Sequence, residues 1–300
     1  MLKIAFSPLY CLPLPEGHRF PMVKYDLIPK QLLYQGYIQK ENLFEPDYLD
    51  KDTAVLTHCE KYWERLMQLE IMPKEMRKIG FPLSEELVKR ELNICAGTIS
   101  CCEYAFEYGV SMNVAGGTHH AFYDRGEGFC VLNDMAIAAN YLLHNNKANK
   151  ILIVDLDVHQ GNGTASLFQA EQRVFTFSMH GASNYPLNKE KSDLDIALPD
   201  LIGDGDYLKL LHQSLAKMFK QIKPEFVFYL SGVDVLTGDK LGRLSLSIEG
   251  CKKRDEMVFE FCKKYNVPVC VAMGGGYSPS IADIVNAHCN TFIAASEIIL

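Results

Sequence analysis

Apolar and polar positions form regular blocks from about residue 84 to the end of the chain. Short apolar runs are typical of buried parallel strands, and after a first strand at Met1–Phe6 they occur at Met112–Ala115, Ile151–Asp155, Val174–Ser178, Phe226–Leu230 and Pro268–Met273. Longer segments with apolar residues at helical spacing predict helices at Ser84–Tyr108, Asn133–His144, Thr164–Ala170, Tyr207–Ile222, Ile248–Tyr265 and Ile281–Ile299. This alternation favours an α/β fold with a mostly parallel central sheet, right-handed crossovers and helices on both faces.

The first eighty residues are less regular than the rest of the chain. Several prolines interrupt them, so we expect much of this segment to be loop: Pro8, Pro13, Pro15, Pro21 and Pro29. We find no internal repeat, low-complexity segment or linker-like stretch. A single domain over residues 1–300 is therefore the predicted organisation.

Long, non-repetitive loops follow the predicted strands. They are Gly116–Leu132, Val158–Gly163, Met179–Asp200, Ser231–Ser245 and Gly274–Ser280. Because the carboxyl ends of parallel strands meet at one edge of a sheet, we expect all five loops to open on the same edge. Each loop carries distinctive polar residues, and loops on a rigid scaffold are where function is usually built. This edge is the predicted functional site.

A metal site is predicted at the end of the strand Ile151–Asp155. Asp155, Asp157 and His159 follow one another there, and buried carboxylates are costly unless they are paired or bound to metal. Asp234, just beyond the strand Phe226–Leu230, is the candidate third ligand beside Asp157 and His159. Two carboxylates and one imidazole suit a catalytic Zn²⁺ with an open coordination position. Taken alone, Asp234 could equally be predicted as a turn or helix-cap residue.

Acid–base chemistry is predicted for the adjacent pair His119 and His120, which follow two glycines at another strand end. Hydrolysis assisted by a metal needs a base for the water and an acid for the departing amine. Asp155 is expected either to orient His119 or to bind a monovalent cation beside the zinc. Asn162 is expected to hold His120, where an amide leaves the imidazole more nearly neutral than a carboxylate would. A packed core histidine is the alternative for either imidazole.

Substrate contacts are predicted from the aromatic and glycine-rich loops. Tyr277 follows a run of glycines that includes Gly275, where backbone can approach a ligand closely, and its phenol is a candidate donor to an oxyanion. Gly128, Phe129 and Tyr185 are candidates for the walls of a narrow tunnel around a linear aliphatic chain. Ordinary loop packing remains the alternative for these residues.

Composition and charge exclude several classes of function. The chain has 300 residues and a formal net charge of −7, which argues against a general nucleic-acid binder. No apolar run is long enough to span a bilayer, and the apolar start is cut short by Ser7 and Pro8, unlike a signal peptide. The ten cysteines include no CxxC pair, so we expect reduced, mostly buried thiols and a cytoplasmic protein.

Six spaced motifs and the N-terminal segment together resemble the zinc-dependent histone deacetylase family. The motifs stand in order along nearly the whole chain, from a Pro15–Met22 segment with Lys24 and Tyr25 through Gly116–His120, Gly128–Asp134, Asp155–Thr164, Ser231–Asp234, Gly238–Gly242 and Gly274–Tyr277. The resemblance implies an arginase/deacetylase α/β fold with a central, mostly parallel sheet of about eight strands. It implies that residues 1–300 form one histone deacetylase-like catalytic domain.

The resemblance also implies roles for single residues. It implies Asp157, His159 and Asp234 as zinc ligands. It implies His119 and His120 as a tandem pair, with His120 as the base and final proton donor. It implies Tyr277 as the phenol that polarises the carbonyl, and Phe129 and Tyr185 as tunnel walls. It implies a structural potassium site formed by Asp155, Ser178 and the backbone carbonyls around Asp157, His159 and Met179.

The reaction implied is removal of an acyl group from the lysine ε-amine of a protein or peptide. Gln160-Gly161-Asn162 stands where class I members have His-Gly-Asp, and the compact length and Asp124-Arg125-Gly126 resemble class IV members and bacterial relatives. Some class IV members that resemble this chain prefer fatty acyl groups, so both acetyl and longer acyl groups stay open. The rival functions are hydrolysis of a small amide such as an acetylpolyamine, and silent binding of acyl-lysine.

Overall fold

Eight strands form one sheet in which every pair of neighbouring strands runs parallel. The computed structural model describes residues 1–300. The strands are β1 Lys3–Ala5, β2 Leu43–Phe44, β3 Val110–Asn113, β4 Ile151–Asp155, β5 Val174–Gly181, β6 Leu194–Leu198, β7 Phe226–Leu230 and β8 Val269–Ala272. Their order across the sheet is β2-β1-β3-β8-β7-β4-β5-β6, so the predicted α/β class and parallel sheet are confirmed.

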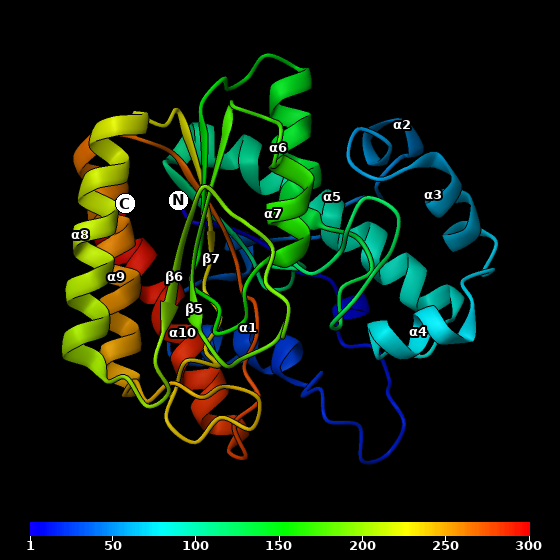
Figure 1. The fold of residues 1–300 in the computed structure, drawn as a ribbon. Helices are drawn as coiled ribbons and strands as arrows, with labels where there is room; N and C mark the ends of the chain where they lie inside the picture. The colour runs from blue at the N-terminus through cyan, green and yellow to red at the C-terminus, as the bar shows by residue number, and fades with distance from the viewer.

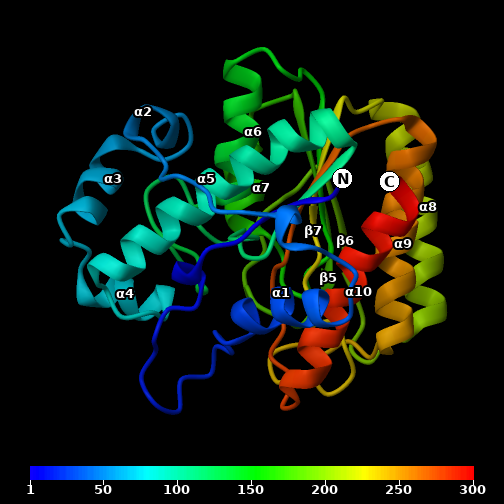
Figure 2. The same ribbon diagram turned by 180° about the vertical axis from the view of Figure 1, so that it is seen from behind.

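Ten α-helices surround this sheet. They are α1 Lys24–Tyr34, α2 Lys51–Ala54, α3 Glu60–Met67, α4 Pro73–Ile79, α5 Glu85–Tyr108, α6 Asp134–His144, α7 Asn162–Phe168, α8 Asp204–Ile222, α9 Ile248–Tyr265 and α10 Ile281–Ile299. α1, α10, α9 and α8 pack on one another in series, and α5 packs on α6. Figure 1 shows α8 and α9 on one side of the sheet and α6 and α7 on the other, and Figure 2 shows the same layers from behind.

The central strands are buried along their whole length. Every residue of β3, β4, β7 and β8 is buried, which is why these strands read as continuous apolar runs in the sequence. β6 lies at the edge of the sheet, and along it exposed residues alternate with less exposed ones. The predicted loop Met179–Asp200 contains this strand, which the sequence did not predict because an alternating edge strand has no apolar run to mark it.

The long helices begin and end at residues suited to those positions. The hydroxyl of Ser84 accepts a hydrogen bond from the backbone N–H of Leu87 at the start of α5, and Gly109 ends that helix in a left-handed conformation. The hydroxyl of Ser247 does the same for Gly250 in α9. These local signals explain why the helix bounds predicted after residue 84 are close to those in the structure.

Much of the segment formed by the first eighty residues is loop, as predicted, but the helices within it were not predicted. The structure has four helices there, α1 to α4. Pro29 lies inside α1, and α3 buries Tyr62, Trp63 and Leu66 against the rest of the molecule. Figure 1 shows α2, α3 and α4 as a group beside the sheet. The prolines therefore indicated the loops but not these helices, because packing against the core stabilises helices that local signals do not mark.

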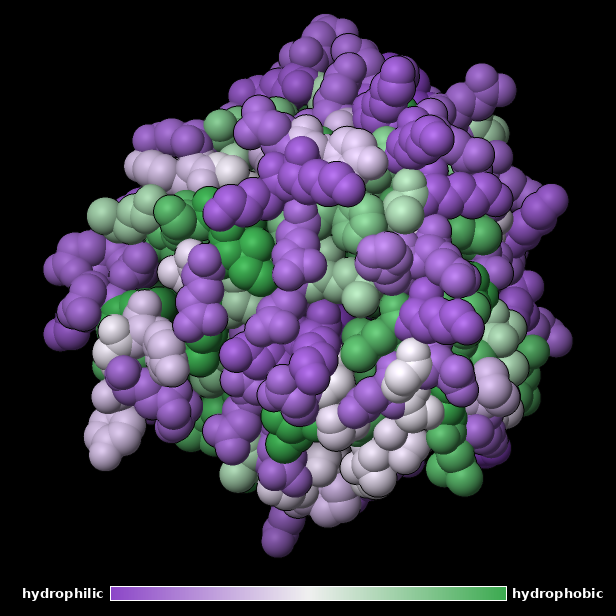
Figure 3. Space-filling model, turned by 90° about the vertical axis from the view of Figure 1, so that its left-hand side faces the viewer, coloured by the Kyte–Doolittle hydropathy of each residue, from purple (hydrophilic) through white to green (hydrophobic).

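The outer surface is largely polar. Figure 3 views the side of the molecule on which α8 and α9 lie, where hydrophilic side chains cover most of the face and hydrophobic ones show only in scattered areas. No helix combines the length and the apolar character that crossing a bilayer requires. All ten cysteines are unpaired thiols, and eight of them are buried.

Candidate active site

The predicted site residues meet at the carboxyl edge of the four central strands. β3, β8, β7 and β4 are neighbours in the sheet, so the loops that follow them lie together. These loops bring His119, Asp157, Asp234 and Tyr277 to one place, although far-separated parts of the chain carry them. Parallel strands leave their carboxyl ends at one edge, and this is where open α/β sheets bind ligands.

Asp157, His159 and Asp234 form a buried three-residue cluster. One possible ligand atom from each lies within 4.8 Å of the others. His159 Nδ1 is 3.0 Å from Asp157 Oδ1 and 3.2 Å from Asp234 Oδ2. The remaining carboxylate oxygens are held by backbone N–H groups, since Gly275 donates to Asp157 Oδ2 and Val158 donates to Asp234 Oδ1. The carboxylates are therefore fixed in orientation, as ligands of a catalytic metal usually are.

The cluster fits a divalent cation. Asp234 Oδ2 is buried and accepts no well-directed hydrogen bond, although His159 is near. Glycines line the carboxylates closely: a Cβ at Gly275 would lie 1.9 Å from Asp234 Oδ2, and one at Gly232 would lie 2.3 Å from Asp157 Oδ2. Burial opposes a charge on His159, but Asp157 and Asp234 raise its imidazole pKa to about 10. The two buried carboxylates thus favour a positive charge between them. Two carboxylate oxygens and one imidazole nitrogen are ligands that suit Zn²⁺.

Two histidines beside this cluster have different partners. His119 Nδ1 is 2.7 Å from Asp155 Oδ2, and His120 Nδ1 is 2.6 Å from Asn162 Oδ1. Burial opposes the charge of both rings. Asp155 outweighs burial at His119 and raises its pKa, whereas burial and the neighbouring imidazoles lower the pKa of His120 well below its usual range. The pair therefore combines an imidazole that favours its protonated form with one that favours its neutral form.

Tyr277 is a buried phenol at the inner end of the site. Burial and then the charges of Asp234 and Asp157 raise its pKa well above the usual value, so the hydroxyl stays protonated and can donate. Its ring lies 6.4 Å from that of His159 and 6.1 Å from that of Phe129, measured between centroids. The phenol is thus placed beside the predicted metal ligands at the base of the pocket.

A cavity of about 390 Å³ leads to these groups. Phe129 and Tyr185 are two of its walls, and the ring of Tyr185 stands perpendicular to that of His120 at 4.9 Å. Gly128 takes a positive φ of 53°, and a Cβ there would lie 2.6 Å from Cδ2 of His120. The structure therefore places the three predicted wall residues at the cavity, with Gly275 directly behind the carboxylates.

A second, smaller cavity of about 40 Å³ lies next to the first and shares several lining residues with it: His120, Gly128, Phe129, His159 and Tyr277. It is also lined by Tyr25 and Arg90. With about 10–15 Å³ needed per water-sized group, it has room for only a few such groups.

The residues predicted to bind potassium are also neighbours. Asp155 and Ser178 are partners in the register of β4 and β5. Asp155 contacts His119, and the Ser178 hydroxyl lies 2.9 Å from Nδ1 of His180. The potassium assignment stays a prediction.

The sequence predicted no role for two residues that hydrogen-bond the backbone of the site loops. Asp239 accepts hydrogen bonds from the backbone N–H groups of Leu241, Gly242 and Tyr277. It lies in the quoted Gly238–Gly242 motif, which was the available signal. Arg254 on α9 donates to the carbonyl oxygens of residues 156 and 232, next to the loops of the metal cluster. Nothing in the sequence separates that arginine from the surface cations around it.

Comparisons with known proteins agree with this geometry. The family described as the histone deacetylase domain matches residues 18–292. An uncharacterized protein of Picosynechococcus sp. is 43% identical over 295 residues, 98% of each chain. Histone deacetylase 2 of Arabidopsis thaliana is 29% identical over 89% of this chain and 72% of that protein. The crystal structure of an HDAC homolog from Aquifex aeolicus has a similar fold, with a TM-score of 0.84, 24% identity and coverage of 98% of this chain and 84% of that one.

Proposed function

The chain belongs to the histone deacetylase family, and we propose that it is a zinc-dependent hydrolase that removes acetyl groups from lysine side chains of proteins or peptides. One observation carries this proposal. Asp157 and His159, which form a cluster with the buried Asp234, line the smaller cavity together with two histidines and a buried phenol. Those are the groups that metal-assisted hydrolysis of an amide requires.

The metal cluster and the phenol would act on the scissile carbonyl. A zinc ion held by Asp157, His159 and Asp234 would polarise that carbonyl and make water acidic enough to be activated at neutral pH. Tyr277 donates a hydrogen bond to the same carbonyl oxygen and to the oxyanion that develops from it. Its phenol is protonated because burial holds its pKa high.

The two histidines divide the proton transfers. Nδ1 of His120 faces the Asn162 carbonyl oxygen, so this nitrogen carries the proton and Nε2 is free to accept one from water. His119 is hydrogen-bonded through Nδ1 to Asp155, which stabilises its protonated form. A proton taken up at the pair is then returned to the leaving amine, which gives free lysine and a carboxylate.

The inner cavity supports acetyl over long acyl groups. It has a volume of about 40 Å³ and is enclosed by Tyr25, Arg90 and the site residues. An acetyl methyl fits a space of this size, whereas a chain of many methylenes would require side chains around it to move. We therefore place acetyl-lysine ahead of fatty acyl-lysine.

The two rival functions are less well supported. An acetylpolyamine carries positive charge, and an enzyme for it needs acidic groups at the pocket mouth, yet no Asp or Glu is among the residues that line the cavity. A silent binder needs no hydrolytic groups, yet the cluster, the histidine pair and the phenol are all present.

A competition assay tests the substrate class. Zinc-loaded protein is given equal concentrations of an acetyl-lysine peptide, its myristoyl-lysine counterpart and acetylspermidine, and release of each product is followed. We expect acetate release from the peptide at least tenfold faster than either alternative. Faster turnover of acetylspermidine would overturn the peptide assignment, and faster myristate release would overturn the acyl assignment.

A further inference from the structure

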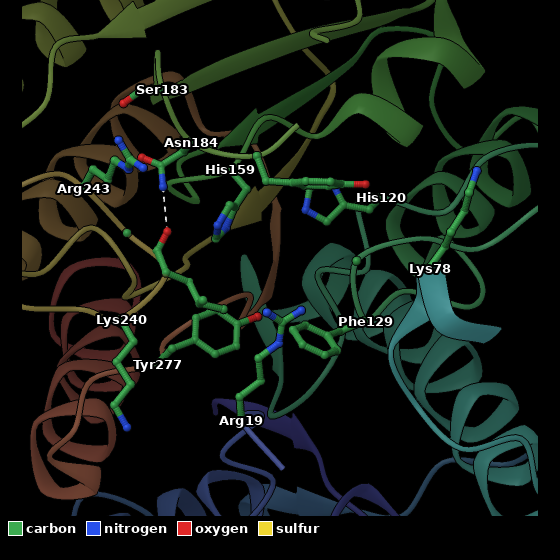
Figure 4. Close-up of a pocket in the computed structure, with 14 residues that line it drawn as sticks. Arg19, Lys78, His120, Phe129, His159, Ser183, Asn184, Lys240, Arg243 and Tyr277 are labelled. Atoms are coloured by element: carbon green, nitrogen blue, oxygen red, sulfur yellow. Dashed lines mark hydrogen bonds between the residues drawn. The ribbon is translucent and has the colours of Figure 1, made fainter. Parts of the chain in front are cut away.

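The mouth of the cavity is ringed by positive charge. Four of the fourteen residues that line it are lysine or arginine, and none is aspartate or glutamate. We call this group the basic collar, and it consists of Arg19, Lys78, Lys240 and Arg243. In Figure 4 the four side chains lie around Phe129, His159 and Tyr277. This surrounds the entry to the predicted catalytic groups with cations.

The collar is assembled from separate parts of the chain. Arg19 lies in the segment before α1, Lys78 in α4, and Lys240 and Arg243 in the loop after β7. Exposed lysines and arginines are common on any surface, and a run of them on one helix would need no explanation. Here the fold gathers cations from three segments at one opening.

Two of the four cations of the collar have no acidic partner. Arg19 and Lys240 take part in no ion pair, and Arg19 lies over the ring of Phe129 at 5.1 Å from its centroid. The acidic neighbours of the other two are Glu127, 3.9 Å from Lys78, and Asp200, 3.5 Å from Arg243.

These two carboxylates do not cancel the collar. Glu127 is already paired with Arg125 at 3.0 Å and accepts a hydrogen bond from the hydroxyl of Tyr185. Asp200 also accepts a hydrogen bond from Ser183, and it can offset the charge of Arg243 only. The opening therefore keeps an excess of positive charge, in a chain whose formal net charge is −7.

We propose that the basic collar selects acyl-lysine peptides that carry aspartate or glutamate two residues before or after the acylated lysine. The inference rests on the proposed function and names its substrate class. An acylated lysine side chain is uncharged, so any electrostatic selection must act on the residues that flank it. Since side chains two residues apart in an extended peptide point to the same side, the side chains two positions before and after the acyl-lysine face the rim while the acyl-lysine enters the cavity. Cations around an opening focus the field on an approaching anionic segment and raise its rate of association.

The test uses three fluorescein-labelled acetyl-lysine peptides of equal length, flanked by glutamate, glutamine or lysine at the positions two residues before and after the acetyl-lysine. Binding to the full, zinc-loaded protein is measured by anisotropy, and kcat/KM by acetate release, each in about 0.02 M and about 0.5 M salt. The variant is Arg19→Gln with Lys240→Gln, which removes the two unpaired charges of the collar. The control is Lys209→Gln with Lys217→Gln on α8, which makes the same change in net charge at exposed positions away from the cavity.

In low salt we expect the glutamate-flanked peptide to exceed the lysine-flanked one about tenfold or more in both affinity and kcat/KM. High salt and the collar variant should each reduce this ratio to about threefold or less, and the α8 control should keep it. Equal affinity for the three peptides, or a ratio that the collar variant keeps, would overturn the collar proposal. Binding preference without hydrolysis of any peptide would overturn the proposed function and leave the collar proposal standing.

Discussion

The carboxylate of Asp239 accepts a 2.6 Å hydrogen bond from the backbone N–H of Tyr277. Its other oxygen accepts from the N–H groups of Leu241 and Gly242, at 2.8 and 2.9 Å. One buried carboxylate therefore joins the loop after β7, which carries Asp234, to the loop after β8, which carries the phenol. Its contribution to the site is to position Tyr277 relative to the metal cluster.

Replacing Asp239 with asparagine should disturb this position. The amide keeps one acceptor oxygen and turns an N–H₂ donor toward a backbone donor, at a cost of about 1–3 kcal/mol for the unsatisfied group. We expect Asp239→Asn to lower kcat about tenfold while zinc content stays at the wild-type value. Asp206→Asn, on the exposed first turn of α8, is the control. Unchanged kcat would remove Asp239 from the positioning of the phenol.

The phenol itself gives a second prediction. Tyr277→Phe removes the hydroxyl and keeps the ring that packs beside Phe129. Loss of one preorganised oxyanion donor should lower kcat about 10²–10³-fold, with zinc still bound. Tyr123→Phe, at an exposed tyrosine, should have no effect on kcat. Wild-type turnover by the Tyr277 variant would exclude the hydroxyl from the reaction.

Arg254 gives a third prediction. Its guanidinium is buried, pairs with Asp255 and donates to the carbonyl oxygens of Leu156 and Gly232. Leu156 precedes Asp157, and Gly232 precedes Asp234 by two residues. Arg254→Lys keeps the positive charge opposite Asp255. It loses the planar guanidinium that donates to the backbone of both the loop after β4 and the loop after β7.

We expect the zinc dissociation constant of Arg254→Lys to rise about tenfold, because the groups that orient metal ligands affect affinity by that amount. A competition titration against a chelating dye measures it, and circular dichroism checks that the variant is folded. Arg173→Lys, at an exposed ion pair with Glu171, is the matched control. An affinity equal to that of the wild type would contradict this role.

A fourth prediction concerns stability and pH. His58 is fully buried, with Nδ1 2.8 Å from the carbonyl oxygen of Phe122 and Nε2 accepting from the N–H of Asn133. Burial lowers the imidazole pKa to about 4. An unfolded histidine has a pKa of about 6.5. Between pH values of about 6.5 and about 4, the unfolded chain therefore binds a proton at His58 that the native protein does not bind. The free energy of unfolding falls as the pH drops through this range.

Urea unfolding at about pH 7 and about pH 5 measures this effect. Between those values the free energy of unfolding should fall about 2 kcal/mol more for the wild type than for His58→Gln. His144→Gln, at an exposed histidine of α6, should follow the wild type. Parallel curves for the wild type and His58→Gln would show that His58 binds its proton equally in both states.

The central part of the fold and site was predictable because burial leaves a strong sequence signal. Strands β4 and β7 are buried on both faces, so they read as apolar runs whose ends mark the loops with Asp157 and Asp234. His119 contacts Asp155 and His120 contacts Asn162, the two partners expected from the sequence at and after the end of β4.

The N-terminal helices could not be predicted by the same reasoning. α1 contains Pro29 and buries the charged Lys24, whose ammonium donates to the carbonyl oxygen of Gly274. Both features argue locally against a buried helix, and the buried ammonium is satisfied only by the carbonyl oxygen of the distant Gly274. Burial lowers the pKa of Lys24 to about 8, which shows how strongly tertiary packing overrides local preference here.

Groups that act through long-range contacts were also beyond sequence reasoning. Arg19 and Lys240 lie at one cavity mouth, and Arg254 contacts loops that follow two different strands. In the sequence, nothing distinguishes the side chains of these residues from those of exposed lysines and arginines. Only the fold shows which cations face the site and which face water.

Acetate release as a function of zinc content tests the central claim most directly. The protein is stripped with a chelator, zinc is added back in steps, and hydrolysis of an acetyl-lysine peptide is measured beside bound zinc, with Asp234→Ala as the variant. Activity should rise in proportion to zinc up to one ion per chain, and the variant should neither bind zinc at that level nor hydrolyse the peptide. Full activity in the stripped protein, or none at one bound zinc per chain, would contradict the proposed function.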